Sequence, residues 1–394
     1  MNVIYLFNIF ILICLFLITG IWCYIICIWL RSIEKSPKLI EEGNKQLHDH
    51  PKVSIILPAK NEQNHIKKCI QSILDQDYPN YELILINDAS EDKTLDIMKQ
   101  FSEKENKVKV IDLDYKPEGW VGKNWACYKG YLQSGGEILL FTDADTYHKT
   151  DTLSLSILYF FKHKLDTLNV LPKTIGATFL SKLILPLYTL HQHTFCSPVY
   201  TNDPNSKRKN AYFLGTYYLL RRDAYEKIGT HKAVRQEFNE DIFIGEKLRN
   251  LGFKVHTIRG ELNLYTETIR SSNYIFNQIS RVIIPYYRTN KLIALRLTIF
   301  LFAIEFSPPF LLLYSIISYL YHGNLFPEMI SLILSLTSVA IMVIVSSLQM
   351  KYGLYQNPLY GLGAPIGAGV YSFAYLVALL KAILRAKVAW REAA

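Results

Sequence analysis

Residues 53–62 read Val-Ser-Ile-Ile-Leu-Pro-Ala-Lys-Asn-Glu, a mostly apolar run followed by a more polar segment. The apolar run Val53–Leu57 predicts a strand that is buried in a sheet. The loop Pro58–Glu62 follows at once, and Asn61 is expected to cap the next helix. That helix would place five apolar residues on one face: Ile66, Cys69, Ile70, Ile73 and Leu74.

The same alternation continues along the chain. Further strands are predicted over Tyr81–Asn87, Val108–Asp112 and Glu137–Thr142, with helices over Lys93–Glu103 and Gly122–Leu132. Strands that alternate with helices indicate an α/β fold whose mainly parallel sheet is covered on both faces. Ligands of such sheets bind beyond the carboxyl ends of the strands, so the chemistry is expected there.

The pattern after Asp151 is less regular. Phe179–Phe195 is apolar and fits either a core helix or a helix lying against a membrane. A strand is expected over Tyr212–Leu220, where Gly215 is interpreted as a turn residue. A helix is expected over Glu240–Leu251, ending at Gly252.

Composition points to a membrane protein. Of the 394 residues 50% are hydrophobic, and the stretches 3–30 and 292–384 carry almost no charge. The net charge of +9 is spread over both ends of the polar part, which fits a place beside anionic lipid better than a nucleic-acid surface. The six cysteines show neither zinc-site spacing nor a dense disulfide pattern, which favours a reducing compartment.

The first apolar segment, Asn2–Leu30, is long enough to cross a bilayer, and a cleaved signal peptide is the alternative. Basic residues follow it directly, so the next domain is expected in the cytoplasm of a multi-pass cell-membrane protein. Three further spans are expected near 293–320, 326–349 and 361–384, the first kinked or broken at Glu305 and Pro308–Pro309. This count would put the C-terminus outside, whereas its basic residues favour the cytoplasm, so the number of spans stays open.

The expected organisation follows from these patterns. It comprises a membrane helix (1–30), a linker (31–50), an α/β domain (51–271), an interfacial amphipathic helix (272–290), a C-terminal membrane region (291–386) and a basic tail (387–394). His191 and His193 are two positions apart and do not converge on one helix face, so they are interpreted as surface or interface residues.

Acidic residues follow the predicted strands. Asp88 ends the second strand, Asp143 and Asp145 follow the fourth, and Glu240-Asp241 opens the late helix. A single aspartate in such a place is as easily a turn residue or a helix cap. All of them in this order indicate a ligand site at one edge of the sheet.

The pair Asp143-x-Asp145 suits a metal ion. Carboxylates at i and i+2 on an extended segment point the same way and repel unless a cation lies between them. Mg²⁺ or Mn²⁺ binds such oxygen ligands and can bridge phosphate oxygens. A hydrated turn is the alternative.

With the Pro58–Glu62 loop, the Asn87–Thr94 segment, Thr142–Asp145 and Glu240-Asp241, the chain resembles family 2 glycosyltransferases over about residues 50–290. The resemblance implies a GT-A fold in which a loop matching Pro58, Ala59, Asn61 and Glu62, together with the match to Asp88, holds the nucleoside. It also implies that Asp143 contacts ribose or diphosphate, that Asp145 binds the metal, and that Asp241 is the catalytic base.

The residues agree with these implied roles. Inverting transfer needs a base on the acceptor hydroxyl and stabilisation of a leaving diphosphate. Asp241 can be that base, and Glu240 can share the work. As an alternative, Asp241 simply favours the positive end of its helix.

Gly122-Lys123-Asn124-Trp125-Ala126 matches a Gly-Lys-x-x-Ala stretch of the family, with Lys123 placed to meet a diphosphate or merely solvated. With Pro117-Glu118-Gly119-Trp120 before it, the stretch is similar to diaponeurosporenoate glucosyltransferases and hopanoid-biosynthesis-associated glycosyltransferases. These subgroups share the layout of one N-terminal span, a catalytic domain and a C-terminal cluster of spans. Gln278-x-x-Arg281 resembles the Gln-x-x-Arg-Trp signature of polysaccharide synthases and ceramide glucosyltransferases, with Val282 in place of Trp. Arg281 then supports the nucleotide-sugar diphosphate, or it snorkels from an interfacial helix.

The expected function is inverting, metal-dependent transfer of a hexose from a UDP-sugar, UDP-glucose in first place, to a lipophilic membrane acceptor such as a carotenoid or isoprenoid-like lipid. The alternatives are a processive polysaccharide synthase and a ceramide-type lipid glucosyltransferase. A non-enzymatic anchor with a degenerate nucleotide-sugar fold is the third class.

Overall fold

The structure, a computed structural model, describes residues 3–39, 50–195, 197–206, 213–269, 272–289, 291–323 and 326–384. The chain divides into two compact units. The described residues within 35–174 and 196–268 form the α/β unit, and those within 3–34, 175–195 and 269–384 form the helical unit. The expected basic tail, 387–394, lies outside the described residues.

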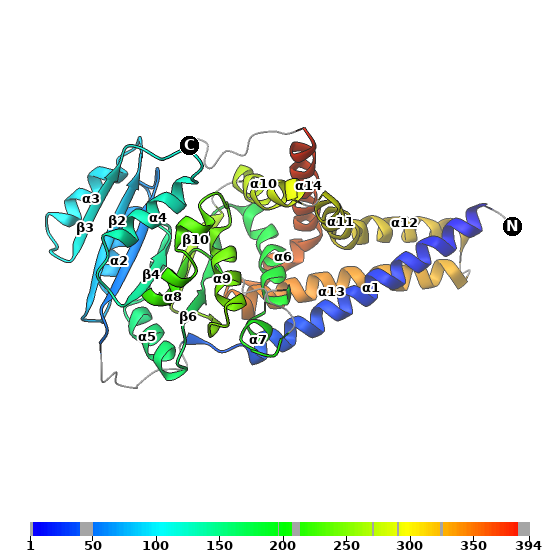
Figure 1. Ribbon diagram of the computed structural model, residues 1–394. Helices are drawn as coiled ribbons and strands as arrows, with labels where there is room; N and C mark the ends of the chain where they lie inside the picture. Colours follow the sequence, from blue (N-terminus) through cyan, green and yellow to red (C-terminus); the bar gives the residue numbers. More distant parts are fainter. Residues whose placement is uncertain are drawn as a thin grey trace. The chain divides into compact units, whose positions relative to one another are not determined.

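A seven-stranded sheet forms the centre of the α/β unit, in the order β3-β2-β1-β4-β8-β6-β9 (Figure 1). Its strands are β1 (Val53–Ala59), β2 (Tyr81–Asp88), β3 (Val108–Leu113), β4 (Ile138–Thr142), β6 (Thr167–Leu171), β8 (Tyr217–Arg221) and β9 (Val255–Arg259). The pairs among β3, β2, β1 and β4 are parallel, whereas β8 runs antiparallel to both of its neighbours. The expectation of a mainly parallel sheet is confirmed.

Helices cover both faces of this sheet. One face packs against α2 (Ile66–Leu74), α3 (Thr94–Ser102) and α5 (Thr152–Lys162). The other packs against α4 (Gly122–Leu132), α8 (Arg222–Lys227) and α9 (Glu240–Asn250). All residues of β1 and β2 are buried, as expected for strands covered on both sides. β8 begins later than the strand expected over Tyr212–Leu220, because residues 213–216 form the loop and turn that lead into it.

A second, three-stranded sheet lies beside the carboxyl end of β4. It contains β5 (Thr146–His148), β10 (Leu264–Ile269) and β7 (Lys173–Gly176), in the order β5-β10-β7. Short connecting elements complete the unit: α7 (Pro198–Thr201) and the 3₁₀ turn His231–Val234.

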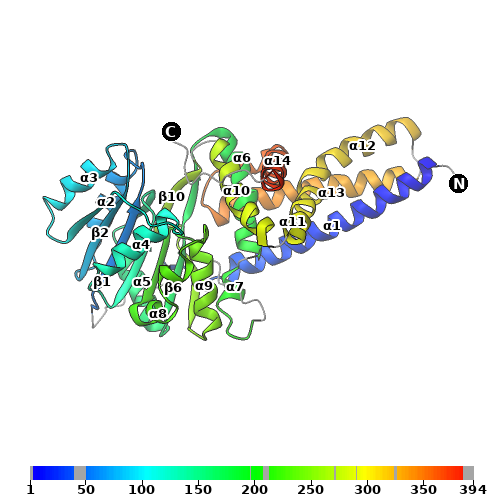
Figure 2. The ribbon, with the colours of Figure 1, turned by 45° about the horizontal axis from the view of Figure 1, so that its top comes forward.

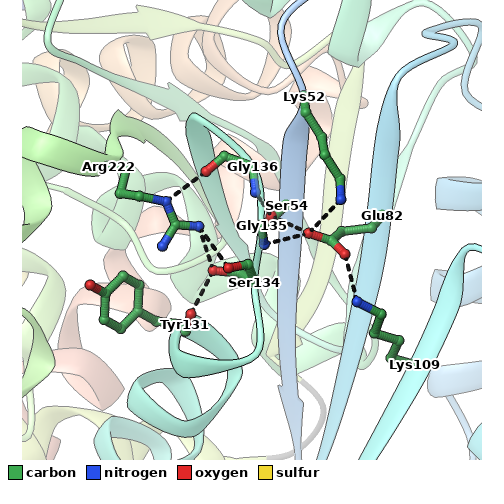
Figure 3. A network of polar contacts seen from close by, with 9 residues as sticks. All are labelled: Lys52, Ser54, Glu82, Lys109, Tyr131, Ser134, Gly135, Gly136 and Arg222. Carbon is green, nitrogen blue, oxygen red and sulfur yellow. Dashed lines mark hydrogen bonds and ion pairs between the residues drawn. The ribbon is translucent and has the colours of Figure 1, made fainter.

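A polar network holds the amino ends of the central strands together (Figure 3). Glu82 of β2, whose side chain is 7% exposed, accepts hydrogen bonds from Ser54 of β1 at 2.8 Å and from the backbone of Gly135 at 2.7 Å, and lies 2.9 Å from Lys109 Nζ. Arg222 binds the same loop through the carbonyl oxygens of Ser134 and Gly136. The network fixes the α4–β4 loop at the end of the sheet opposite the strands' carboxyl ends.

Among its described residues, the helical unit contains four helical runs long and apolar enough to cross a membrane: Leu6–Lys35, Lys291–His322, Phe326–Gly353 and Pro358–Ile383. They are built from α1 (Val3–Lys35), α11 (Lys291–Leu301), α12 (Ser307–His322), α13 (Phe326–Leu348) and α14 (Ala364–Ile383). The second run continues through Glu305 by a π-helical turn, Phe302–Phe306, whose Ile304 carbonyl accepts from the Trp22 indole at 3.1 Å. Figure 2 shows α1 running alongside α13, where Thr19 and Ser338 hydroxyls are 2.7 Å apart.

Two further helices belong to the helical unit: α6 (Phe179–Phe195) and α10 (Ser272–Thr289). Gln349 binds α6 through Thr189 at 2.9 Å and His193 at 3.0 Å. His191 lies 2.8 Å from Glu305, a carboxylate that is 1% exposed. Both histidines were expected at a surface or an interface, and the structure excludes the surface for His193, which is buried inside the unit, while His191 is largely covered as well.

Candidate active site

The loops after β1 and β2 are tied to each other. The Asn61 backbone N–H donates to Ser90 Oγ at 3.0 Å, and Asn61 Oδ1 accepts from the Glu91 N–H at 2.9 Å. Asn61 takes a left-handed conformation (φ 53°), which asparagine tolerates well. It does not cap α2, because His65 precedes that helix. Its role is instead to join the two loops at the carboxyl edge of the sheet.

The same edge holds the other predicted loop residues. Pro58 and Ala59 are buried at the end of β1. The Glu62 backbone N–H donates to Thr94 Oγ1 at 2.7 Å, and the Glu62 side chain is buried. The Pro58–Glu62 loop is thus hydrogen-bonded to the segment that follows Asp88.

Asp88 closes β2 and is 8% exposed. Gly122, the first residue of α4, lies so close that a Cβ atom on it would be 2.4 Å from Asp88 Oδ2. Burial raises the pKa of Asp88, and the charges of Lys60 and Lys116 oppose this rise. A buried carboxylate with two lysines nearby is well suited to accept hydrogen bonds from a polar ligand.

Lys123, the second residue of α4, joins carboxylates from two distant parts of the chain. Its Nζ lies 2.9 Å from Asp143 Oδ1, after β4, and 2.9 Å from Glu240 Oε1, at the start of α9. The Lys123 side chain is 16% exposed and that of Glu240 is 2% exposed, so both charges are largely removed from water. Buried charges of this kind are stable only when paired, and the two carboxylates raise the pKa of Lys123 despite its burial.

Asp241 is held by two backbone donors. The Gly215 N–H donates to Oδ2 at 2.6 Å, and the Ile242 N–H donates to Oδ1 at 2.9 Å. Burial and the neighbouring charge of Glu240 raise the pKa of Asp241 to about 7, while Lys123 opposes the rise. A half-buried carboxylate with a pKa near neutrality, fixed in direction, has the properties of a general base.

Asp145 has different surroundings from Asp143. It is 5% exposed, and its Oδ1 accepts from the Thr266 hydroxyl of β10 at 3.4 Å. Asp143 is instead 31% exposed at its side chain and faces Lys123. The ammonium of Lys123 neutralises the charge of Asp143 in this structure.

The two aspartates fit a divalent ion only as part of a larger set. Among the described residues no group of three or more His, Cys, Asp or Glu side chains could hold a metal. Mg²⁺ and Mn²⁺ bound with phosphates commonly take one or two carboxylates from the protein and the remaining oxygens from substrate and water. Asp143 and Asp145 supply that number of hard oxygen ligands.

Gln278 and Arg281 lie on α10 of the helical unit. Arg281 Nη1 donates to Gln278 Oε1 at 3.4 Å, so the two predicted residues contact each other across one turn. Their role at the diphosphate stays a prediction.

Sequence reasoning missed two participants. Gly215 lies in a turn, as interpreted, but its N–H reaches the predicted base, and Thr266 lies against Asp145. Neither residue type carries chemistry by itself, and each lies far along the chain from its partner. The glycine at position 215 is a turn signal in the sequence, whereas Thr266 carries no such local signal.

Part of the chain matches a known protein family. Residues 54–229 match the family model "Glycosyl transferase family 2". The match assigns a family 2 glycosyltransferase domain to residues 54–229, which are a part of the chain. This domain includes β1 to β8 and the residues Asp88, Lys123, Asp143 and Asp145, whereas Glu240 and Asp241 lie just beyond the matched range.

Two curated relatives match at modest identity. The probable glycosyltransferase YdaM of Bacillus subtilis (strain 168) is 28% identical over 222 residues, which is 55% of this chain and 51% of the relative. The 4,4'-diaponeurosporenoate glycosyltransferase of Staphylococcus aureus (strain USA300) is 26% identical over 217 residues, 54% of this chain and 55% of the relative. The chain thus matches about half the length of these relatives.

Among solved structures, the mannosyltransferase PcManGT of Pyrobaculum calidifontis, described in complex with GDP-Man and Mn²⁺, has a TM-score of 0.55 at 14% identity. The alignment covers 96% of this chain and 100% of that one. At this identity the likeness shows the fold, and it confirms the expected GT-A type.

Proposed function

We propose that the chain transfers a hexose to a hydroxyl or carboxyl group of a lipophilic membrane acceptor, and that the transfer inverts the anomeric configuration of the sugar. The favoured donor is UDP-glucose. The observation that carries the proposal is Asp241, a neutral-range base held beside Glu240, Lys123 and Asp143. Nucleotide-sugar chemistry needs both a base and positive charge near a diphosphate, and this cluster contains both.

The steps follow from the residues. The nucleoside binds against the Pro58–Glu62 loop and Asp88, where the buried carboxylate accepts its polar hydrogens. The diphosphate lies near the start of α4, where backbone N–H groups and Lys123 attract negative charge. Asp143 and Asp145 would hold a Mg²⁺ or Mn²⁺ ion, which would supply positive charge to stabilise the leaving diphosphate.

The oxygen of the acceptor group attacks the anomeric carbon of the sugar, and Asp241 takes the proton that this acceptor oxygen loses. The bond from that carbon to the diphosphate oxygen breaks, and the nucleoside diphosphate leaves on the opposite face of the sugar, which inverts the configuration. Because both Asp241 oxygens already accept backbone hydrogen bonds, the carboxylate needs no reorientation before it acts.

Membrane attachment supports a lipid acceptor. The helical unit holds four helices long enough to cross a bilayer, and the S. aureus relative is named for a carotenoid-type acceptor. An acceptor that stays in the bilayer is best reached by an enzyme that is itself attached to the membrane. In this proposal residues 51–271 form the cytoplasmic catalytic domain, 272–290 an interfacial helix, and Gln278 and Arg281 support the donor diphosphate.

The experiment incubates the purified full chain with a panel of nucleotide sugars, Mn²⁺ or Mg²⁺, and a membrane lipid extract, followed by mass spectrometry of the extract. The proposal predicts a lipid that gains one hexose, with UDP-glucose as the best donor. A ladder of oligosaccharides would instead show a processive synthase. Absence of any glycosylated product with every donor would contradict the proposal.

A further inference from the structure

Gly215 occupies the point where the active-site charges converge. A Cβ atom on it would lie 2.5 Å from Lys123 Nζ, 3.3 Å from Asp241 Oδ2 and 3.5 Å from Asp143 Oδ2. Real Cβ atoms essentially never come within 3.0 Å of a non-bonded heavy atom from another part of the chain, so a side chain at this position must displace the Lys123 ammonium.

Backbone conformation does not explain this glycine. The described glycines with positive φ are Gly119, Gly229, Gly252 and Gly323, and Gly215 is not among them. An alanine could therefore adopt the same backbone and keep the N–H that binds Asp241. What an alanine cannot keep is the space for the ammonium.

Lys123 links the two halves of the proposed site. Through Asp143 it contacts the donor side, and through Glu240 it contacts the residue next to the base. The Lys123 ammonium forms ion pairs with both Asp143 and Glu240. The position of this ammonium therefore sets how the two carboxylates are arranged before substrate binds.

We propose that Gly215 is a positioning residue for the transfer reaction, because its missing side chain admits the Lys123 ammonium between Asp143 and Glu240. The inference rests on the proposed function for its catalytic meaning, but its physical content concerns the free protein. Gly215 acts through Lys123 and does not itself touch the reacting atoms.

The first test needs no substrate. Reductive methylation of lysines in the full chain, read by peptide mass spectrometry, reports how accessible each ammonium is, with the exposed Lys99 as internal reference. Gly215→Ala should speed the labelling of Lys123 several-fold relative to Lys99. The matched control is Gly369→Ala, where a Cβ meets nothing within 4 Å and labelling of Lys123 should stay as in the wild type.

The second test is a double-mutant cycle on transfer of labelled glucose and on binding of UDP with Mn²⁺. If Gly215 acts by admitting Lys123, Gly215→Ala should lower kcat strongly in the wild-type background and hardly at all once Lys123→Met is present. Equal losses in both backgrounds, or unchanged Lys123 labelling in Gly215→Ala, would overturn the inference. If the wild type transfers no sugar, the proposed function fails, and the labelling and binding results still decide the role of Gly215.

Discussion

The backbone N–H of Gly215 donates a 2.6 Å hydrogen bond to Asp241 Oδ2, across 26 positions of sequence. The bond fixes one oxygen of the proposed base from the loop before β8, while α9 fixes the other through Ile242. Donors to a carboxylate favour its charged form, whereas burial and Glu240 disfavour it, and the second influence is larger. As a result, the Asp241 carboxylate has a pKa of about 7, and its orientation is fixed by the two hydrogen bonds.

The pH dependence of transfer should follow Asp241. A base works only when it has lost its proton, so kcat/KM should fall as the pH drops below about 7 and level off above it. Glu240→Gln removes a charge that raises the pKa of Asp241, so in that variant the midpoint should move to lower pH. A rate that does not change across the neutral range in the wild type would show that another group is the base.

Metal removal should stop transfer. We expect a chelator to abolish activity and added Mn²⁺ or Mg²⁺ to restore it. Asp145→Asn should raise the metal concentration needed for half-maximal rate by about 10–100-fold, at least the effect seen for groups around bound metals. Asp114→Asn, at an exposed position, is the control. Full activity of Asp145→Asn in the presence of chelator would rule out this metal role.

Gly122 should control binding of the nucleoside. Its Cα lies against Asp88, so Gly122→Ala places a Cβ 2.4 Å from Asp88 Oδ2 and must push the carboxylate aside. We expect weaker binding of UDP by roughly tenfold, which corresponds to an overpacking cost of about 1–2 kcal/mol. Calorimetry with UDP measures this, with Gly369→Ala as control. Unchanged UDP affinity would place the nucleoside away from Asp88.

Stability in acid should depend on Glu82 (Figure 3). Burial raises its pKa, but hydrogen bonds from the Gly135 N–H, Lys109, Ser54 and Lys52 outweigh this and lower it to about 2. A lowered folded-state pKa stabilises the fold above the ordinary value of 4.5, and this stabilisation is lost as the pH falls toward 2.

Glu82→Gln should therefore destabilise the α/β unit by about 1–3 kcal/mol at neutral pH, because it leaves buried donors poorly paired. Thermal unfolding against pH measures the difference, which should shrink as the pH falls below 4.5. The control is the exposed Glu103→Gln, for which no change is expected. A Glu82→Gln variant as stable as the wild type would show that water replaces these hydrogen bonds at no cost.

The parallel half of the sheet could be predicted from the sequence because each of its strands has a clear local sequence pattern. β1 and β2 are continuous buried runs, and α4 begins at the Gly122 that the pattern indicated. The positions of the carboxylates followed, since the ends of parallel strands meet at one edge.

The remaining parts depend on contacts between distant residues. β8 enters antiparallel between β4 and β6, and β5 has only three residues, too short for a periodic signal. Likewise α6 joins the helical unit through Gln349, and Lys123 reaches Glu240, 117 positions later, only after the sheet has formed. No local pattern encodes such pairings.

The most direct test compares the wild type with Asp241→Asn, using UDP-glucose labelled in the sugar and the lipid extract that contains the acceptor. We expect labelled lipid from the wild type, and a rate lower by about 10²–10⁴-fold in Asp241→Asn, while UDP binds both proteins equally. Labelled lipid formed at the wild-type rate by Asp241→Asn would contradict the assignment of Asp241 as the catalytic base.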